Sequence, residues 1–376
     1  MSMTAMNRIL EIDPADRLVR CEPGVVTAEL AAAVAGHGLF YPPDPVSGQT
    51  CTIGGNLATG AGGVCCVKYG VSADYALGLS VVLADGTLTR TGRRTVKGVA
   101  GYDLTRLFVG SEGTLGVIVE ATLALRPARP PALAMLAQFR SAREAGDAVA
   151  AIVAAGHVPS ALELMDRATT RAVVDLGHPL LASGEAATLI VESDAPDPGT
   201  HIAAMAELCR AAGAIHLELA SDAERTAEIL RARRLISPAV YKILEGMPGR
   251  PTAFIEDVAV PRSRLAAMIE RIEEISARYG LYISATGHAG DGNLHPLVLF
   301  DQDDEGEVRK AENAYDAIMA AGAELGGTIT GEHGVGLLKR DWLRRELDPA
   351  ALLLQHALKR MLDPSGILNP GKVFDV

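Results

Sequence analysis

The sequence predicts an α+β protein with two or three domains. With 376 residues, the chain is long enough for two or three domains of ordinary size. Up to about Arg126 it is rich in glycine and in short strand-like runs, and a proline-rich stretch at 127–131 then prevents the last strand from continuing. Beyond that stretch, strand-like runs alternate with longer helices, which predicts a sheet with helices on one face. We therefore expect domains at 1–126 and 132–327, followed by a C-terminal segment at 328–376.

Turn and stop signals place the elements of the first domain. A helix is expected over 28–35, between Thr27 and the stop signals at Gly36 and Gly38. The Asp85-Gly86 pair predicts a two-residue hairpin turn, because glycine accepts the positive φ that a type I′ turn needs. The expected strands are 9–12, 18–21, 77–84, 87–91 and 117–125.

Capping signals place the helices of the second domain. Ser141 with Glu144 forms a capping box that opens a helix ending at Gly156, and Ser221 with Glu224 opens another. The remaining expected elements are strands at 187–192, 254–260 and 281–285, helices at 203–212 and 264–279, and a helical tail at 341–362.

Charge and cysteine content exclude several classes of protein. Lys and Arg total 35 against 46 Asp and Glu, a net charge of −11, and an acidic chain without a basic face binds nucleic acid poorly. The sequence shows no signal peptide and no apolar run of about 18 residues that could span a membrane. The five cysteines lack metal-type spacing, which indicates free thiols in a reducing compartment. We expect a cytoplasmic protein without a membrane span or a nucleic-acid partner.

Two glycine-rich segments are candidates for ligand binding. Gly54–Gly63 contains five glycines, and a backbone without side chains lets a flat or anionic ligand approach its N–H groups. The segment fits neither the P-loop nor the Gly-x-Gly-x-x-Gly fingerprint, so a structural loop would explain it equally well. A second turn at Gly110–Gly116, also next to a strand, favours a ligand lying across the tips of both.

Two histidines flank the Asp291-Gly292 dipeptide between two apolar runs. If this dipeptide forms a two-residue hairpin turn, His288 and His295 are directly opposite, with Cβ atoms about 4.5–5.5 Å apart. Two imidazoles at that spacing can share a divalent metal. The alternative is a pair of polar neighbours at a sheet edge, and with nine histidines in the chain a chance pairing is not negligible.

Glu332 and His333 are flanked by glycines and could complete that site. Glu332 would give a His-His-carboxylate set with an open coordination position, which is typical of a catalytic metal. Zn²⁺ suits such a mixed set best, with Mn²⁺, Co²⁺ and Fe²⁺ as alternatives. His333, pointing elsewhere, could transfer a proton near neutral pH. A metal-dependent hydrolase is a weaker interpretation, because it leaves the glycine-rich segments without a purpose.

Arg233 belongs to the run Leu230–Arg234, where a solvated helix face is the ordinary explanation. That explanation is favoured for Arg231 and Arg234. A single arginine aimed into a site could instead bind a substrate carboxylate through two parallel hydrogen bonds.

Several motifs, in order along the chain, carry a family resemblance. They are Tyr41-Pro42-Pro43-Asp44-Pro45, Thr52-Ile53-Gly54-Gly55-Asn56, Lys68-Tyr69-Gly70-Val71, Gly101-Tyr102-Asp103-Leu104, Gly110–Gly116, Gly287–Pro296, Gly331–Gly336 and Asn369-Pro370-Gly371-Lys372. Together they resemble the FAD-linked oxidase family that contains the glycolate oxidase D subunit, D-lactate dehydrogenase and D-2-hydroxyglutarate dehydrogenase. This family belongs to the vanillyl-alcohol-oxidase type of flavoprotein.

The resemblance implies a partial FAD-binding domain, an antiparallel-sheet cap domain and a C-terminal segment returning to the flavin side. It makes His288, His295 and Glu332 the metal ligands and His333 the base, with Arg233 for the substrate carboxylate and Ser237 as an assisting hydroxyl. The FAD contacts that it implies are Pro43, Asp44, Thr52, Gly54, Gly55, Asn56, Thr59, Ala61, Gly62, Glu112, Gly113, Ile118 and Asn369.

Three departures from the family pattern bear on function. Ile255 stands where some members have a substrate-binding lysine, which weakens a claim for 2-hydroxyglutarate, and Gly60 stands where many have asparagine. Relatives also begin with a further flavin subdomain, upstream of the part equivalent to Met6–Leu10.

From the motifs and the resemblance together, we expect FAD-dependent oxidation of a small D-2-hydroxy acid of the glycolate or D-lactate class. The alternative is a flavin-free binding or scaffold subunit that needs a partner chain. The resemblance leaves room for an electron-accepting partner protein and for a homo-oligomer.

Overall fold

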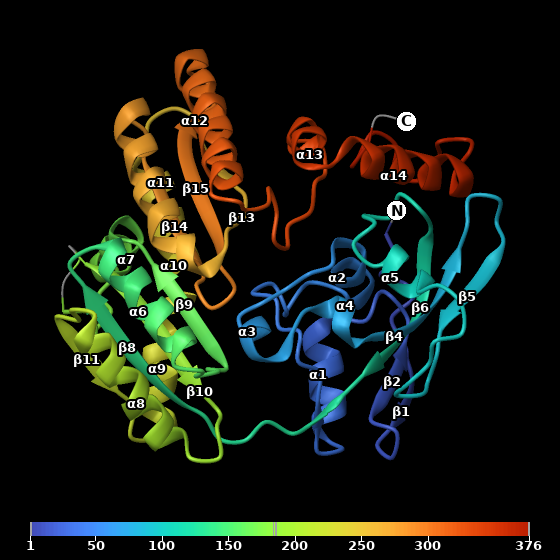
Figure 1. Ribbon diagram of the computed structural model, residues 1–376, viewed down its shortest axis with the longest axis horizontal. Helices are drawn as coiled ribbons and strands as arrows, with labels where there is room; N and C mark the ends of the chain where they lie inside the picture. The colour runs from blue at the N-terminus through green and yellow to red at the C-terminus, as the bar shows by residue number, and fades with distance from the viewer. Residues whose placement is uncertain (1, 183, 185, 375–376) are drawn as a thin grey trace. The chain divides into compact units, whose positions relative to one another are not determined.

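A computed structural model describes residues 2–182, 184 and 186–374 of the chain, which divides into two units (Figure 1). The first unit combines the chain up to Arg129 with the chain from Glu332 onward, and the second comprises Pro130–Gly331. The second unit is therefore an insertion within the first. The chain passes from one unit to the other after Arg129 and after Gly331, each a few residues from a predicted domain limit. The first of these points lies within the proline-rich stretch.

The first unit is built on a five-stranded antiparallel sheet in the order β1-β2-β6-β4-β5. Its apolar core joins Val19 and Leu123 of the sheet to Leu30 and Ile53 of the helices. The strands are β1 (Ile9–Asp13), β2 (Leu18–Cys21), β4 (Ala76–Val82), β5 (Leu88–Gly92) and β6 (Val117–Ala124), with a separate pair of β3 (Leu39–Phe40) and β7 (Arg126–Pro127). The helices are α1 (Thr27–Ala35), α2 (Ile53–Thr59), α3 (Cys66–Tyr69), α4 (Ser72–Tyr75), α5 (Leu104–Phe108), α13 (Arg340–Glu346) and α14 (Pro349–Leu362).

A buried lysine ties the C-terminal helices to the N-terminal part of this unit. The Lys359 ammonium on α14 donates to the carbonyl oxygens of Thr114 and Leu368, each at 2.9 Å, and to Asp363 Oδ2 at 2.5 Å. Lys359 is only 4% exposed, so its three hydrogen bonds compensate for the loss of hydration of the charge. The chain segment after Asp363 is thereby fixed next to the glycine-rich turn at 110–116.

The β4–β5 hairpin differs from the two-residue turn predicted at Asp85-Gly86. Leu83 N donates to Thr87 O at 2.9 Å and Gly86 N to Leu83 O at 3.0 Å, which leaves a three-residue loop, and Gly86 has a φ of +84°. A type I turn followed by a left-handed glycine closes such a loop. The glycine was thus correctly assigned a positive φ, but it occupies a different turn, and the strand register moves by one residue.

The second unit contains an eight-stranded antiparallel sheet in the order β11-β8-β10-β9-β14-β15-β12, with β13 also paired to β15. Its strands are β8 (Leu133–Phe139), β9 (Ala161–Met165), β10 (Ala187–Ser193), β11 (His216–Leu219), β12 (Pro251–Ile255), β13 (Val258–Ala259), β14 (Ile283–His288) and β15 (Asn293–Asp301). The helices are α6 (Ala142–Ala154), α7 (Arg167–Asp175), α8 (Pro198–Ala211), α9 (Ala223–Arg234), α10 (Ile236–Gly246), the 3₁₀ turn Arg262–Arg264, α11 (Leu265–Tyr279) and α12 (Glu305–Glu324).

The α+β class is confirmed, but helices cover both faces of this sheet, not one as expected. One layer holds α6, α8, α11 and α12, and Figure 1 shows α11 and α12 alongside β14 and β15. A second core joins Ala134 and Leu136 of β8 to Val173 of α7, Ile229 of α9 and Ala239 of α10. Since alternate residues of a strand face opposite sides, the fully buried strands β9 and β10 pack against helices on both faces. Among the described residues, no helix is both long and apolar enough to cross a membrane.

Candidate active site

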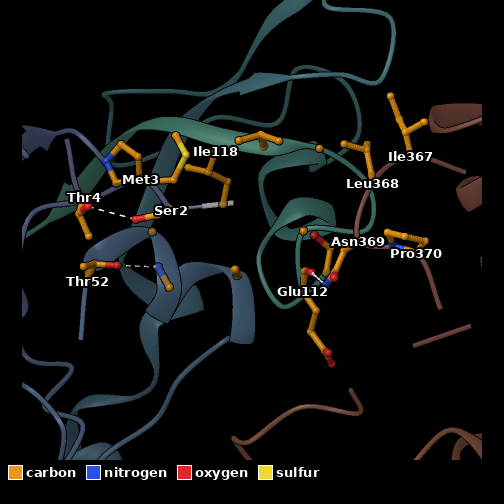
Figure 2. A pocket seen from close by; sticks show the side chains of 18 residues that line it. Ser2, Met3, Thr4, Thr52, Glu112, Ile118, Ile367, Leu368, Asn369 and Pro370 are labelled. Carbon is orange, nitrogen blue, oxygen red and sulfur yellow. Dashed lines mark hydrogen bonds between the residues drawn. The ribbon is translucent and has the colours of Figure 1, made fainter. Parts of the chain in front are cut away.

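A cavity of about 640 Å³ opens in the first unit between the glycine-rich segments (Figure 2). Several predicted FAD contacts line it: Thr52, Gly54, Gly55, Glu112, Gly113, Ile118 and Asn369. The N-terminal residues Ser2–Thr4 and the C-terminal residues Ile367–Pro370 complete its wall. Parts of the chain more than three hundred residues apart in sequence therefore enclose one space large enough for a cofactor-sized ligand.

Side-chain hydrogen bonds and left-handed backbone conformations shape the wall of this cavity. Thr52 begins α2 and its hydroxyl accepts a hydrogen bond from Gly55 N at 3.3 Å. Glu112 and Gly113 both have positive φ, +53° and +69°, and a glutamate in that region is strained. The Asn369 side-chain amide donates to the Glu112 carbonyl at 2.6 Å, which stabilises this turn. The backbone of the second glycine-rich turn is thus held in a left-handed conformation at the cavity.

The Glu112 carboxylate serves a different purpose from its backbone. Its Oε1 accepts from Val335 N at 2.6 Å and its Oε2 from Gly336 N at 2.9 Å. Figure 2 shows this side chain extending away from Ile118 and Leu368. Glu112 was predicted as an FAD contact; its main chain lines the cavity, while its side chain anchors the loop that follows His333.

A second cavity of about 370 Å³ shares Gly55 with the first and is lined by four further predicted FAD contacts. Its wall includes Glu332 and His333 together with Asn56, Thr59, Ala61 and Gly62. A Cβ at Gly62 would overlap the Glu332 carboxylate, so the absence of a side chain there lets the carboxylate lie against the loop. The two remaining predicted contacts, Pro43 and Asp44, line neither cavity; Asp44 Oδ1 accepts from Cys65 N at 3.0 Å.

In the second unit, His288 and His295 lie on one face of the sheet, but not directly opposite each other. The loop between β14 and β15 has four residues, Ala289–Gly292, so His288 pairs with Asn293, and Thr286 with His295. The expected register was therefore wrong by two positions. Because side chains alternate with a period of two, an even shift keeps both histidines on the same face as diagonal neighbours. Their ring centroids are 5.2 Å apart.

A buried glutamate that the sequence analysis missed connects two predicted site residues. Glu163 on β9 pairs directly with His288 on β14 and is 1% exposed. Its Oε1 lies 2.6 Å from His288 Nδ1, and its Oε2 accepts from Arg233 Nε at 2.7 Å. Burial would raise the pKa of the Glu163 carboxyl, but the His288 imidazole and the Arg233 guanidinium hold that pKa below its ordinary value. A lone glutamate within the apolar run Ala161–Met165 was the available signal, because a buried charge requires a partner.

The other predicted residues of the second unit have less enclosed positions. Arg233, near the end of α9, has a side chain 15% exposed, and its two Nη atoms make no hydrogen bond with another described residue. Ser237 is exposed in the first turn of α10, and Ile255 is 59% exposed at the end of β12. The Asn293 Oδ1 atom, beside His288 in the register, is buried and has no hydrogen-bond partner among the described residues.

Gly331 fixes the chain immediately before Glu332. Its N–H donates to Asp257 Oδ2 at 2.7 Å, and a Cβ on it would come within 2.6 Å of Asn293 Oδ1. A glycine is therefore required for the backbone to pass so close to Asn293, the cross-strand partner of His288. Glu332 follows directly, with its Cα about 3.8 Å further along the chain.

Comparisons with known proteins identify the family of the chain. The family described as FAD linked oxidases, C-terminal domain, matches residues 131–373, and the family described as FAD binding domain matches residues 1–92. Glycolate oxidase subunit GlcD of Bacillus subtilis is 41% identical over 371 residues, which cover 98% of this chain and 78% of the relative. The mitochondrial D-lactate dehydrogenase [cytochrome] of Arabidopsis thaliana is 35% identical over 376 residues, which cover 100% of this chain and 65% of the relative.

Solved structures support the fold. A p-cresol methylhydroxylase with substrate bound matches with a TM-score of 0.76 at 18% identity, over 98% of this chain and 78% of that one. A 4-ethylphenol oxidase from Gulosibacter chungangensis matches with a TM-score of 0.74 at 22% identity, over the same shares of the two chains. These likenesses confirm the expected fold of the flavoprotein type. On the family match and the sequence identity to its relatives, the chain belongs to the FAD-linked oxidases.

Proposed function

We propose that this protein oxidises a small D-2-hydroxy acid, of the glycolate or D-lactate class, to the 2-keto acid with FAD and a divalent metal. One observation carries the proposal. The expected base His333 and the expected metal ligand Glu332 line the same cavity as the expected FAD contacts Asn56, Ala61 and Gly62. The names of the relatives, glycolate oxidase subunit and D-lactate dehydrogenase, support the substrate class.

The cavities of the first unit fit a flavin cofactor. Gly54, Gly55 and Gly113 present bare backbone to the larger cavity, and at Gly113 a Cβ would meet no neighbour within 4 Å and project into open space. The residues that would hold FAD are those lining the two cavities, with Thr52 and Asn369 supporting the turns by their side-chain hydrogen bonds. When bound, FAD supplies an acceptor for the hydride of the substrate.

The donor types of His288, His295 and Glu332 would suit a divalent metal, for which we propose zinc. His288 and His295 supply imidazole nitrogens on one face of the sheet, and Glu332, tethered through Gly331, would supply a carboxylate oxygen. The unpartnered Asn293 Oδ1 beside them is a buried acceptor, suited to a hydroxyl or a water molecule at such a site. When bound, the ion acts as a Lewis acid that makes a hydroxyl more acidic.

The chain itself would position the substrate and move the proton. The Arg233 guanidinium, with its outer Nη edge available, would bind the substrate carboxylate through two parallel hydrogen bonds. The Ser237 hydroxyl would assist from the adjoining helix. A His333 ring nitrogen would accept the hydroxyl proton, since imidazole exchanges protons near neutral pH. By analogy with relatives named as subunits, a partner protein would take up the electrons.

Flavin content and flavin reduction test the proposal. Purified protein should contain FAD or bind it when reconstituted, and anaerobic addition of one acid from a panel of glycolate, D-lactate and D-2-hydroxyglutarate should bleach the flavin absorbance. Full flavin occupancy without bleaching by any of these acids would contradict the proposal. A colourless protein that cannot be reconstituted would instead support the flavin-free binding subunit.

A further inference from the structure

Glu163 uses both of its carboxylate oxygens, one on each of two residues of the proposed site. Oε1 lies 2.6 Å from His288 Nδ1, and Oε2 accepts from Arg233 Nε at 2.7 Å. The three groups come from β9, β14 and α9, and the β9–β14 pairing places Glu163 directly beside His288. At 1% exposure the glutamate has almost no access to water. The two hydrogen bonds therefore define its environment.

The bond to His288 determines which imidazole nitrogen can bind a metal. An ionised carboxylate only accepts hydrogen bonds, so the Nδ1 atom of His288 must carry the proton and donate it. A neutral imidazole then has its lone pair on Nε2, and metal-binding histidines commonly have their other nitrogen bonded to a carboxylate in this way. The same bond sets the rotation of the ring, because Nδ1 is held at a fixed position on the neighbouring strand.

The bond to Arg233 determines the plane of the guanidinium. Arginine donates through five N–H bonds in one rigid plane, and the Nε–H is occupied by Glu163. The Nη edge lies in the same plane, remote from Nε, and can bind a carboxylate with two parallel hydrogen bonds. A single buried group thus orients the metal-binding ring and the carboxylate-binding guanidinium together.

We propose that Glu163 is a positioning residue that holds His288 and Arg233 in register with each other, so that metal and substrate are bound in a fixed relative geometry. The inference rests on the proposed function and adds to it a residue outside the ligand set. If Glu163 were only part of a structural buried ion pair, it would contribute to folding but would affect neither zinc affinity nor the tautomer of His288.

The test compares Glu163→Gln with Glu192→Gln. Glu192 is a matched control because it is also a buried glutamate of this sheet, on β10, and its Oε1 accepts from Ser160 Oγ at 2.8 Å. Zinc affinity is measured on metal-free protein by competition with a chelator. We expect Glu163→Gln to weaken zinc binding about 10–100-fold, as the loss of such supporting carboxylates does. It should also raise KM for the hydroxy acid, because an amide cannot accept from both neighbours.

A second measurement needs no glutamate variant. Long-range ¹H–¹⁵N correlation spectra of metal-free wild-type protein, with His288 assigned by its loss in His288→Ala, should show the Nδ1–H tautomer. Equal zinc affinity and KM in wild type and Glu163→Gln, or an Nε2–H tautomer at His288, would overturn the inference alone. Wild-type protein that binds no zinc would overturn the proposed metal centre, and the inference with it. If Glu192→Gln weakened zinc binding as much as Glu163→Gln, the effect would be a general loss of packing, and this result would also overturn the inference.

Discussion

The two units build their candidate sites from different parts of the polypeptide. In the first, glycines at positions 54, 55, 62 and 113 expose backbone in the cavity walls, between apolar and polar side chains. In the second, charged and imidazole side chains meet from strands and a helix separated by 70 and 125 residues. Where bare backbone forms the wall, as at Gly62, an added side chain would occupy space that a neighbouring group now fills. A site made of side chains depends on the strand register and on each of the side chains that hydrogen-bond to one another.

The largest expected effect concerns the side-chain site. His288→Ala and His295→Ala should each abolish stoichiometric zinc in elemental analysis, because two ligands cannot hold the ion at micromolar concentration. His333→Ala should keep the zinc and lower turnover about 10²–10⁴-fold, the usual contribution of a general base. If either histidine variant retained one zinc per chain, the proposed ligand set would be wrong.

The next prediction concerns the place where bare backbone meets a charged side chain. Gly62→Ala should weaken zinc binding about tenfold or more, because its Cβ would displace the Glu332 carboxylate. Gly36→Ala is the matched control, since its Cβ would meet nothing closer than 3.5 Å and its φ is −60°. Chelator competition on both variants measures the effect. Unchanged affinity in Gly62→Ala would show that Glu332 does not bind the ion.

A third prediction separates backbone strain from side-chain bonding at one residue. Glu112→Ala should lower the free energy of unfolding by about 3 kcal/mol, because two N–H groups of the Val335–Gly336 loop lose a charged acceptor. Glu112→Gly should be about 1 kcal/mol more stable than Glu112→Ala, since glycine relieves the strain of a φ of +53°. Urea unfolding of the three proteins provides the comparison. Alanine and glycine variants of equal stability would argue against strain at this turn.

A fourth prediction concerns Asp166, which caps α7 and whose Oδ2 accepts from Ala285 N at 2.7 Å. Burial raises the pKa of this carboxyl to about 6, against the opposing effect of its hydrogen bonds. An acid whose pKa is higher in the folded state binds its proton more tightly there, so stability should fall as the pH rises from about 4 to about 6, by roughly 3 kcal/mol, and stay level above. Asp166→Asn should lack this slope in urea unfolding between pH 4 and 7. Identical slopes in both proteins would assign the pH dependence to other groups.

The two units also differ in how much of each could be predicted from the sequence. Glycine spacing is local, so Gly54–Gly63 and the turn at 110–116 could be selected from sequence alone as candidates for ligand binding, and residues of both line cavities. The shared face of His288 and His295 was predicted although the turn was wrong, because an even register shift does not change the face of a strand. Glu163 could not be assigned a partner, since its role depends on the pairing of β9 with a strand more than a hundred residues later. The second helix layer was missed because strands buried on both faces lack the alternation that would reveal it.

The insertion of the second unit into the chain of the first has a consequence for biosynthesis. All of the residues from Pro130 to Gly331 emerge from the ribosome before α14, so the inserted unit can fold while its host still lacks Lys359 and the Asn369 side chain. The turn at 110–116 must wait for both, because its hydrogen-bond partners Lys359 and Asn369 are translated after the inserted unit. The cavity wall is therefore completed only after the inserted unit has been translated, so the histidine-bearing sheet has time to form before a cofactor can be enclosed.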